Sequence, residues 1–594
     1  MKRASRSKKI KKINKMSKPA ATLIYPKELV KSPISPPGVR LEENIYVSMR
    51  DRIKIAVDIY RPENEGRYPA LLSLAPYIKD IQQQPPHWSH SIESGATGFY
   101  VPRGYVHVIA QGRGSGLSQG QWNFFDEKER RDGYDLVEWI AKQPWCNGNV
   151  GMIGDSYFSW SQYSVAQQQP PHLKCLCQCD ATIDLYRDVF YQGGIFNSPQ
   201  FVEYWIPNSM NMIVWPGFVE GKVPPINLGF EVTSHPYDGP FYWDRSAWPK
   251  LDKIKVPVMS IVPQRGILHV RGQLDAFPKI KSPKKLIVAP QSGFWSHLRY
   301  LTNKALNQQM LRWFDYWLKG IDTGIMNDPE VAIFDMATRK WRYENEYPLK
   351  RTQWAKFYLR SNPAGLATEP PYGLLTIEPP GDEKPDSYKL PDSVAQLAAG
   401  KPVLAYSTPS LEKDFRLWGP VSITFYASST ALDTAWFVKL MDINPDGSFT
   451  FITRGILKAS FRKVDRARSK PGQPFHPFMK QELLEPNKIY EFQIEIWPVF
   501  HTFKTGHKIQ VQIASDDLQY NTVLRSIDVQ LQPKPVENTI YHDSAHPSHL
   551  FLPIIPDSPE IKPVEPPVSE IDWPFVPAFW MPDTSGWPLL IEKE

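Results

Sequence analysis

The segment VGMIGDSYFSW carries the strongest chemical signal in the chain. It predicts an apolar strand, a sharp turn at Ser156 and a helix that starts immediately afterwards. A serine on such a turn has its Oγ lifted out of the sheet, and the backbone N–H of Tyr157 then faces an oxyanion that forms beside it. Ser156 is therefore the candidate nucleophile and Tyr157 a candidate oxyanion donor. A full G-x-S-x-G elbow has a small residue where this chain has Phe158.

A serine at this turn acts only together with a proton acceptor. His297, in FWSHLRY, follows the apolar run KKLIVAP, so the serine precedes the histidine in the chain as it does in α/β hydrolases. The alternative interpretation of His297 is a surface-loop residue. The chain has 13 histidines, His269 among them, so one histidine alone is weak evidence.

The elements that would position these residues alternate between strands and helices. Apolar or alternating runs predict strands at 52–60, 68–77, 104–112, 172–179, 256–262 and 284–290, with another just before Ser156. Amphipathic patterns predict helices at 132–145, with Asp132 or Asp135 as N-cap, and at 308–320, ended by Gly320.

This order predicts an α/β domain at 41–180 and 251–345. Region 181–250 is rich in aromatics, Pro and Gly, and we expect it to form a helical cap over the carboxyl edge of the sheet. From 346 to 594, short alternating strands between Pro, Gly, Asp and Asn predict a jelly-roll β-sandwich with a Pro-rich tail from Pro556. The fold class is thus α/β plus all-β.

Composition agrees with a folded chain of several domains. The 594 residues are 42% hydrophobic and 22% charged, and the 58 prolines argue against an all-helical fold. No run approaches the roughly 20 apolar residues that would cross a bilayer. An apolar signal-peptide core is also missing from the sequence, so we expect a cytoplasmic protein.

The net charge of +7 comes from the N-terminus. Residues 1–18 carry nine Lys/Arg and no acid, which leaves −2 for the remainder. We expect residues 1–40 to be a basic, disordered tail and lead-in, with a nuclear or organelle address as the alternative. The nearly neutral remainder of the chain therefore predicts no specific nucleic-acid partner.

The sequence indicates no metal or cofactor. Cys175, Cys177 and Cys179 alternate, so on a strand they share one face at steps of about 6.6 Å, which suits neither a tetrahedral metal site nor neighbouring disulfides. We interpret them as small apolar strand residues in a reducing compartment. The GRGSG segment lacks the Lys-Ser/Thr of a phosphate loop.

Several long segments resemble those of the cocaine-esterase-like (CocE/NonD) hydrolases, which are relatives of the X-Pro dipeptidyl-peptidases. They are RYPALLSLAPYIKD, QGRGSGLSQGQWNFFD, RDGYDLVEWIAKQPWCNGNVGMIGDSY and DLYRDVFYQGGIFN in the first half, and STPSLEKDFRLWGPVSITFYASS, HTFKTGHKIQVQIAS and YHDSAHPSHLFLPI in the jelly-roll region. The similarity runs from about residue 41 to about 555. It implies an α/β-hydrolase domain followed by the family's C-terminal jelly roll.

The resemblance implies that an acyl-enzyme forms on Ser156. It also implies that Tyr77, at the end of an early strand, donates its hydroxyl to the oxyanion beside the Tyr157 N–H. A phenol at the carboxyl end of a strand can point into a cleft where a carbonyl oxygen gains charge. The alternative for Tyr77 is a buried aromatic residue beside Pro76.

The chain departs from the family at the acidic member of the triad. Gly266 stands where the family has an aspartate after the strand at 256–262. Asp180 or Asp184, which follow the preceding strand, are the candidate replacements, because a carboxylate there can still reach the histidine Nδ1. The alternative for Asp184 is a structural cap or a partner of Arg187.

The histidine segment APQSGFWSH is longer than the family's Gly-Pro-Trp-x-His pattern. If Phe294 rather than His297 corresponds to the family histidine, the base is missing. A catalytically weakened or inactive binding protein with a hydrolase fold is therefore one alternative function.

The main expectation is a serine hydrolase that cleaves a small-molecule ester or amide. Tyr186, Phe190, Trp205 and Trp215 of region 181–250 would form the substrate pocket, although any cap core contains such aromatics. A second alternative is an X-Pro dipeptidyl-peptidase, for which Glu203 or Glu220 could bind the substrate ammonium. The partner class is a small acyl compound, and the sequence leaves room for a homo-oligomer.

Overall fold

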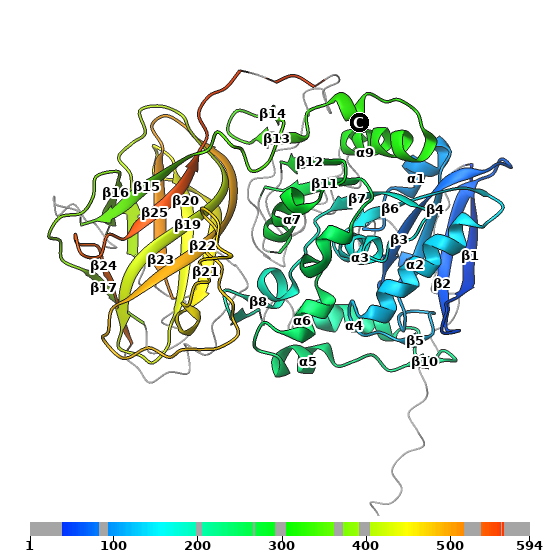
Figure 1. The fold of residues 1–594 in the computed structure, drawn as a ribbon, viewed down its shortest axis with the longest axis horizontal. Helices are drawn as coiled ribbons and strands as arrows, with labels where there is room; N and C mark the ends of the chain where they lie inside the picture. Colours follow the sequence, from blue (N-terminus) through cyan, green and yellow to red (C-terminus); the bar gives the residue numbers. More distant parts are fainter. Residues whose placement is uncertain are drawn as a thin grey trace, which may run out of the picture.

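The computed structural model describes residues 38–81, 93–197, 205–264, 268–290, 304–361, 372–390, 404–515, 536–559 and 561–563. Within them the chain forms an α/β part and an all-β part that lie side by side (Figure 1). In the described residues, no helix combines the length and apolar character that crossing a bilayer requires.

A ten-stranded sheet forms the α/β part, in the order β1-β2-β4-β3-β6-β7-β11-β12-β13-β14. Neighbouring strands from β4 to β13 run parallel. The bounds are β1 Val39–Ser48, β2 Lys54–Pro62, β3 Tyr68–Ala75, β4 Val106–Gln111, β6 Cys146–Asp155, β7 Leu173–Cys179, β11 Val258–Pro263, β12 Lys284–Ala289, β13 Val331–Asp335 and β14 Lys340–Glu344. Each strand predicted for this part coincides with one of these strands.

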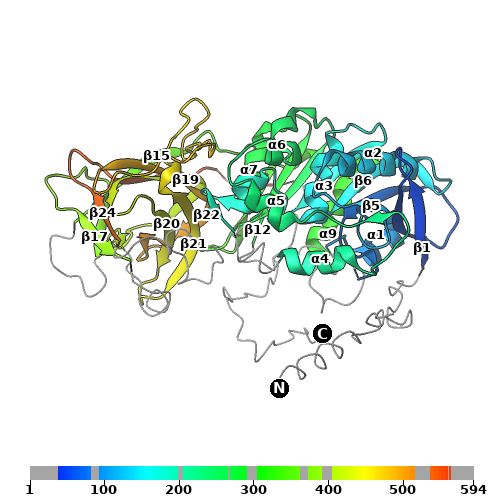
Figure 2. The ribbon, with the colours of Figure 1, turned by 90° about the horizontal axis from the view of Figure 1, so that it is seen from below.

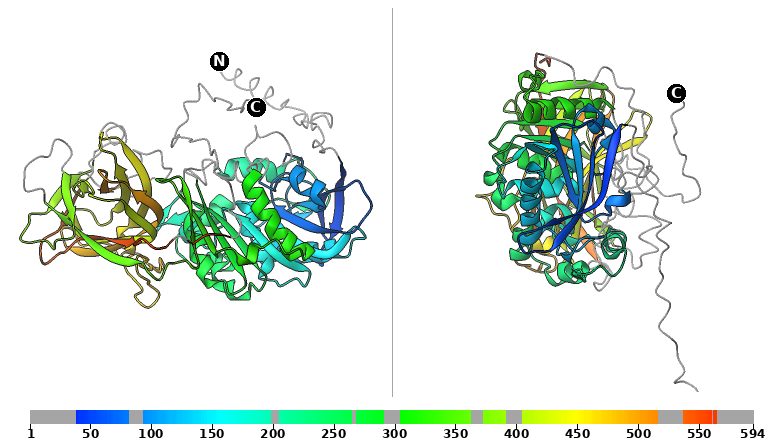
Figure 3. Two further views of the ribbon diagram at one scale, coloured as in Figure 1. Left: turned by 90° about the horizontal axis from the view of Figure 1, so that it is seen from above. Right: turned by 90° about the vertical axis from the view of Figure 1, so that its right-hand side faces the viewer.

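Helices cover both faces of this sheet. The helices are α1 Thr97–Tyr100, α2 Glu127–Ala141, α3 Tyr157–Ala166, α7 Val270–Ala276 and α9 Lys304–Phe314. Leu72 of β3 shares a core with Leu136 of α2, whereas the next residue toward the N-terminus, Leu71, shares the opposite core with Trp313 of α9. The pictures agree: α2 and α3 lie on one side of the sheet, and α9 lies across the other (Figures 2 and 3).

Region 181–250 connects β7 to β11. It contains a π-helix Leu185–Phe190, α4 Ile206–Val214, α5 Leu228–Ser234, α6 Pro240–Arg245, a 3-10 segment Trp248–Lys253, the strand pair β8 Tyr191–Gln192 and β9 Ile195–Phe196, and β10 Lys222–Val223, which pairs with β5 Gly120–Gln121. Further 3-10 turns lie at Lys79–Ile81, Val101–Arg103, Phe277–Lys279, Ile325–Asn327 and Ala459–Phe461.

The all-β part is one sheet that closes on itself into a barrel. Its order is β17-β24-β19-β22-β21-β20-β23-β18-β16-β15-β25, and β19 also pairs with β25. The bounds are β15 Gln353–Arg360, β16 Tyr372–Thr376, β17 Asp386–Lys389, β18 Leu404–Ser407, β19 Phe415–Ser429, β20 Ala435–Ile443, β21 Phe449–Lys458, β22 Tyr490–Phe503, β23 Lys508–Ala514, β24 Glu537–Tyr541 and β25 His549–Ile554.

The helix predicted at 132–145 begins earlier than its apolar pattern indicates. It starts at Glu127, because the Asp126 side chain accepts the Glu129 N–H and caps the first turn. The predicted cap at Asp132 or Asp135 is wrong. Both aspartates lie inside α2, where Asp132 is bonded to Arg113 at 2.6 and 2.8 Å and Asp135 binds Arg50 at 2.7 Å.

The second predicted helix ends as expected. After α9 the chain continues as a π-helical turn at Asp315–Lys319 and stops at Gly320, whose φ of 69° is the left-handed conformation that glycine adopts freely. The three alternating cysteines lie in β7, buried on the face that α9 covers, and none forms a disulfide.

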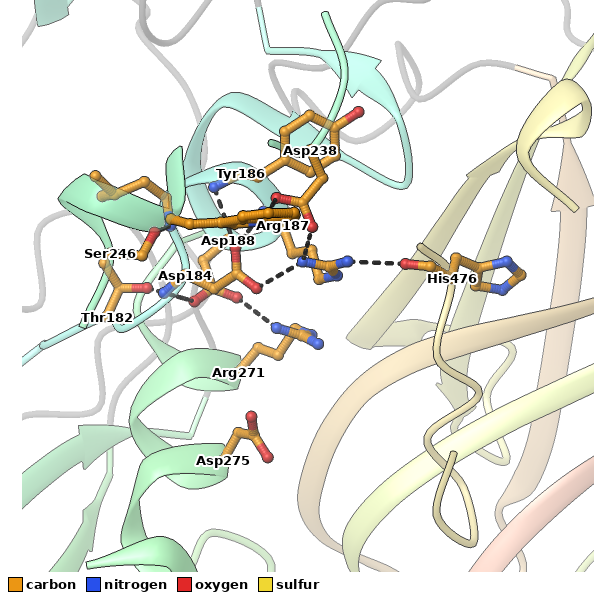
Figure 4. A network of polar contacts seen from close by, with 12 residues as sticks. Thr182, Asp184, Tyr186, Arg187, Asp188, Asp238, Ser246, Arg271, Asp275 and His476 are labelled. Carbon is orange, nitrogen blue, oxygen red and sulfur yellow. Dashed lines mark hydrogen bonds and ion pairs between the residues drawn. The ribbon is translucent and has the colours of Figure 1, made fainter. Parts of the chain in front are cut away.

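A network of buried ion pairs in the α/β part reaches the barrel, and Figure 4 shows the contact between Arg187 and His476. Arg271 of α7 binds Asp188 and, across the interface, Glu495 of β22, each at 2.9 Å. Arg187 of the π-helix binds Asp184 at 3.0 Å and Asp238 at 2.8 Å, and it donates to a barrel carbonyl, His476 O, at 2.9 Å.

Gly272 of α7 lies against this network, so replacing it should destabilise the protein. A Cβ at this position would overlap Asp188 Oδ2 and lie 2.7 Å from Thr182 Oγ1 and 2.9 Å from Ile183 N. We expect Gly272→Ala to lower the free energy of unfolding by about 1–3 kcal/mol. Gly381→Ala is the matched control, because a Cβ there meets nothing within 4 Å. Equal melting temperatures of the two variants would contradict this prediction.

Candidate active site

Three of the predicted site residues follow the carboxyl ends of adjacent parallel strands. Tyr77 follows β3, Ser156 follows β6 and Asp180 follows β7, and β6 lies between the other two in the sheet. Because carboxyl ends of parallel strands share one edge, these residues meet where ligands of open α/β sheets bind. Positions 266 and 297 come after β11 and β12 in the sequence, but both lie outside the described residues, as does Phe294.

Ser156 has the strained backbone of a nucleophile elbow. Its φ of 54° and ψ of −119° are unusual for a residue with a side chain. The Ser156 N–H donates to Cys179 O at 3.1 Å, and the Ser156 carbonyl accepts the N–H groups of Ser159 and Trp160, each at 2.9 Å. Backbone bonds on both sides therefore hold the turn and leave the Ser156 side chain half-buried.

Phe158 is accommodated because residue 154 is glycine. Gly154 has a φ of 144°, and a Cβ there would overlap Phe158 Cβ and lie 3.2 Å from Glu93 O. The elbow thus forms with a fully buried phenylalanine at the position where the usual pattern has a small residue.

Tyr157 begins helix α3, which places its backbone N–H at the helix N-terminus beside Ser156. This orientation suits an oxyanion, since the positive end of the helix dipole adds to the N–H. The Tyr157 side chain is 1% exposed and donates its O–H to Glu129 Oε1 at 2.9 Å. Burial and the neighbouring Glu129 raise the pKa of Tyr157 well above its usual value, so the phenol stays protonated.

Tyr77 is buried beside the elbow, and Trp205 fixes one contact of its hydroxyl. The Tyr77 ring meets the rings of Tyr157 and Phe158 edge-on at 5.8 and 5.9 Å. Trp205 Nε1 lies 3.0 Å from Tyr77 OH. Because an indole N–H only donates, the phenol oxygen accepts in this contact and directs its own proton to a different acceptor.

Asp180 is the fully buried carboxyl at the end of β7. Its Oδ2 lies 3.7 Å from His269 Nδ1, and the His269 ring packs at 5.7 Å from Trp160 of the nucleophile helix. Asp155 is also buried, and burial, Asp180 and Glu93 raise its pKa well above the usual range. A neutral Asp155 removes one negative charge from beside the nucleophile.

Asp184 has a structural environment. Its carboxylate accepts the N–H groups of Tyr186 and Arg187 at 3.2 and 3.1 Å and so caps the π-helix. The same carboxylate pairs with the Arg187 guanidinium at 3.0 Å. Asp184 therefore caps the π-helix and also pairs with Arg187, which are its two structural interpretations from the sequence.

The four aromatics proposed for the pocket have different surroundings. Phe190 and Trp205 both contact the Phe124 ring, at 5.5 and 5.8 Å, next to Tyr157. Tyr186 is fully buried toward the barrel and donates its hydroxyl to Pro236 O at 2.9 Å. Trp215 is half-buried and follows α4.

Two residues near the site, Glu129 and His269, were not among the predicted site residues. Glu129 was missed because the start of α2 was misplaced, although Asp126-x-x-Glu129 has the spacing of a capping box. His269 had no distinguishing local signal, since its contact with Asp180 joins two different strand ends. Among the described residues, no group of three His, Cys, Asp or Glu side chains has the arrangement of a metal site.

Two family models match the chain, one for each part. The model of the X-Pro dipeptidyl-peptidase (S15 family) matches residues 51–212, which include Tyr77, the elbow and Asp180. The model of the X-Pro dipeptidyl-peptidase C-terminal non-catalytic domain matches residues 323–551, which include the barrel except the end of β25.

Similar proteins align with most of the chain. The cocaine esterase of Rhodococcus sp. (strain MB1 Bresler) is 28% identical, over 86% of this chain and 98% of the esterase. A putative Xaa-Pro dipeptidyl-peptidase of Bacillus anthracis is 24% identical, over 84% of this chain and 87% of the relative.

A solved structure of a CocE/NonD family hydrolase from Staphylococcus aureus has the same fold, with a TM-score of 0.76 at 21% identity over 91% of this chain and 99% of the other. The resemblance noted in the sequence is thereby confirmed, as are the α/β-hydrolase fold and the C-terminal β-domain. Residues 51–212 thus match the model of the X-Pro dipeptidyl-peptidase (S15) family and residues 323–551 that of its C-terminal non-catalytic domain, and the chain is a serine hydrolase similar to cocaine esterase over most of its length.

Proposed function

We propose that this serine hydrolase cleaves small esters through an acyl-enzyme on Ser156. The observation that carries the proposal is the elbow itself: a serine with φ 54° and ψ −119° at the carboxyl end of β6, with Tyr77 supplied by the neighbouring strand. An ester is favoured because cocaine esterase is the relative with 28% identity and nearly full coverage.

The reaction follows from the placement of these groups. Ser156 Oγ attacks the acyl carbon and transfers its proton to an imidazole, while the carbonyl oxygen gains charge facing the Tyr157 N–H and the Tyr77 O–H. The imidazolium returns the proton to the leaving alkoxide. Water then attacks the acyl-serine and gives a proton to the imidazole, which returns it to Ser156 Oγ as the bond to the acyl group breaks and the acid leaves. We assign the imidazole to His297, on the basis of its order after β12 and the family resemblance.

Asp180 is our choice for the carboxylate that orients this imidazole. It lies at the strand end next to that of Ser156, and its Oδ2 already lies within 3.7 Å of one imidazole, that of His269. The Asp184 carboxylate is occupied by two backbone N–H groups and by Arg187. A buried carboxylate beside the elbow can hold an imidazole in the required tautomer.

The second candidate is an X-Pro dipeptidyl-peptidase, which the family match and the Bacillus anthracis relative favour. This activity needs an acidic group for the substrate ammonium. Glu220 is solvent-exposed, and Glu203 lies outside the described residues.

The reaction class and substrate class can be tested together. We expect wild-type protein to react with a fluorophosphonate and to hydrolyse p-nitrophenyl butyrate faster than Ala-Pro-p-nitroanilide, and Ser156→Ala to abolish both labelling and turnover. Faster cleavage of the anilide would favour the dipeptidyl-peptidase instead. An unlabelled wild-type protein would contradict both and support the inactive alternative.

Loss of the Tyr77 hydroxyl should slow acylation with little change in KM. Removal of one oxyanion donor lowers kcat by roughly 10²–10³-fold, so Tyr77→Phe should fall in this range. Trp205→Phe, which removes the indole that bonds to Tyr77 OH, should have a smaller effect in the same direction. Both are read from steady-state kinetics with p-nitrophenyl butyrate. A Tyr77→Phe enzyme with wild-type kcat would remove Tyr77 from the oxyanion hole.

The acid and the base can be assigned by paired variants. We expect Asp180→Asn to lower kcat by up to about 10⁴-fold, as loss of the orienting carboxylate does in serine proteases. Asp184→Asn should mainly lower the melting temperature, because it breaks the pair with Arg187. His297→Ala should abolish turnover, whereas His269→Ala should retain most of it. The reverse order within either pair would transfer the role to the other residue.

A further inference from the structure

The Tyr157 side chain is anchored beneath the elbow by helix α2. Its hydroxyl donates to Glu129 Oε1 at 2.9 Å, and its ring stacks on Phe125 with centroids 4.1 Å apart and planes 19° from parallel. The ring and the backbone N–H of Tyr157 share one Cα. Clamping the ring therefore restricts rotation of the N–H that faces the oxyanion.

The second Glu129 oxygen binds the turn at 124–125, whose Phe125 ring stacks on Tyr157. Glu129 Oε2 accepts the Phe125 N–H at 2.9 Å. Phe124 and Phe125 have φ values of 46° and 58°, a strained region that bulky residues rarely adopt. The carboxylate thus stabilises a strained turn and the tyrosine it supports.

This loop also reaches the other group proposed for the oxyanion. The Phe124 ring meets Tyr157 at 6.0 Å and Trp205 at 5.8 Å. Trp205 Nε1 lies 3.0 Å from Tyr77 OH. Glu129 is therefore connected to Tyr157 directly and to Tyr77 through two aromatic side chains.

Glu129 changes charge near neutrality. It is 4% exposed, and burial together with Asp126 raises its pKa to about 7, although the bonds from Phe125 and Tyr157 favour the ionised form. The charged and titratable groups around it are Asp126, which caps its helix, Asp132 of the same helix and the Tyr157 phenol of α3, and Arg130 binds the Phe125 carbonyl nearby. An ionised carboxylate accepts both bonds with full strength, whereas a protonated one has to place a proton on one oxygen.

We propose that Glu129 is a positioning residue for the oxyanion hole, which fixes the Tyr157 N–H through the Tyr157 ring and the 124–125 turn. This inference rests on the roles proposed above for Ser156 and the Tyr157 N–H.

The test compares Glu129→Gln and Tyr157→Phe with Tyr163→Phe. The control removes the same hydroxyl from another fully buried tyrosine of the same helix. We expect the first two variants to lower kcat for p-nitrophenyl butyrate about tenfold above neutral pH, with KM unchanged, because the lost interaction acts in the transition state. The double variant should be no slower than the worse single one.

A pH profile distinguishes a Glu129 that positions the Tyr157 N–H from one that only stabilises the fold. The ratio of wild-type to Glu129→Gln kcat should fall toward one as the pH drops through about 7, because wild-type Glu129 then becomes neutral as glutamine is. The imidazole base titrates in both enzymes, so its effect on kcat cancels in this ratio. The ratio of wild-type kcat to that of the control should not change with pH.

Two results would overturn the inference. One is wild-type kcat in Glu129→Gln and Tyr157→Phe, and the other is a pH-independent ratio accompanied only by a lower melting temperature. If Glu129→Gln fails to fold, Tyr157→Phe, which loses a single oxygen, still gives the kcat and KM readout. A wild-type protein that a fluorophosphonate does not label at Ser156 would instead refute the proposed function.

Discussion

The left-handed backbone at Ser156 is the constraint on which the site depends. A strand that passes directly into a helix has to reverse its path within one residue, and for serine this conformation costs about 1–3 kcal/mol. The bond from the Ser156 N–H to Cys179 O and the first-turn bonds of α3 offset that strain. The sheet therefore holds the turn rigid, and it fixes the positions of the residues around the turn.

The sequence predicted those parts of the fold that depend on local pattern. Apolar runs predicted the parallel strands except β13, and the serine turn and Gly320 were recognisable because each needs a particular backbone conformation at one residue. The start of α2 was not predictable in this way. Asp132 and Asp135 have the residue type of a cap, but their partners Arg113 and Arg50 lie 19 and 85 residues away, beyond any local pattern.

The candidate site was predictable to the same extent. Ser156, Tyr157 and Tyr77 each follow a strand that the sequence revealed, so their convergence is a consequence of the parallel order. The surroundings of Asp180 and Glu129 depend on contacts between different strand ends and helices. Neighbouring strands are about 4.8 Å apart, so a carboxylate at the end of β7 is displaced by one strand spacing from the family position after β11. The Asp180 side chain would have to span this spacing to act as the substitute that we propose.

Groups of the barrel bind two buried arginines of the α/β part, Arg271 and Arg187. Glu495 neutralises Arg271 from the barrel side, and Arg187 donates to a barrel carbonyl while it binds two aspartates of the α/β part. A transplanted barrel without an acid at the position of Glu495 would remove one of the two carboxylates that pair with Arg271 and leave Asp188 as the other. A chimera of the two parts would therefore have to retain an acid at this position to keep both ion pairs of Arg271.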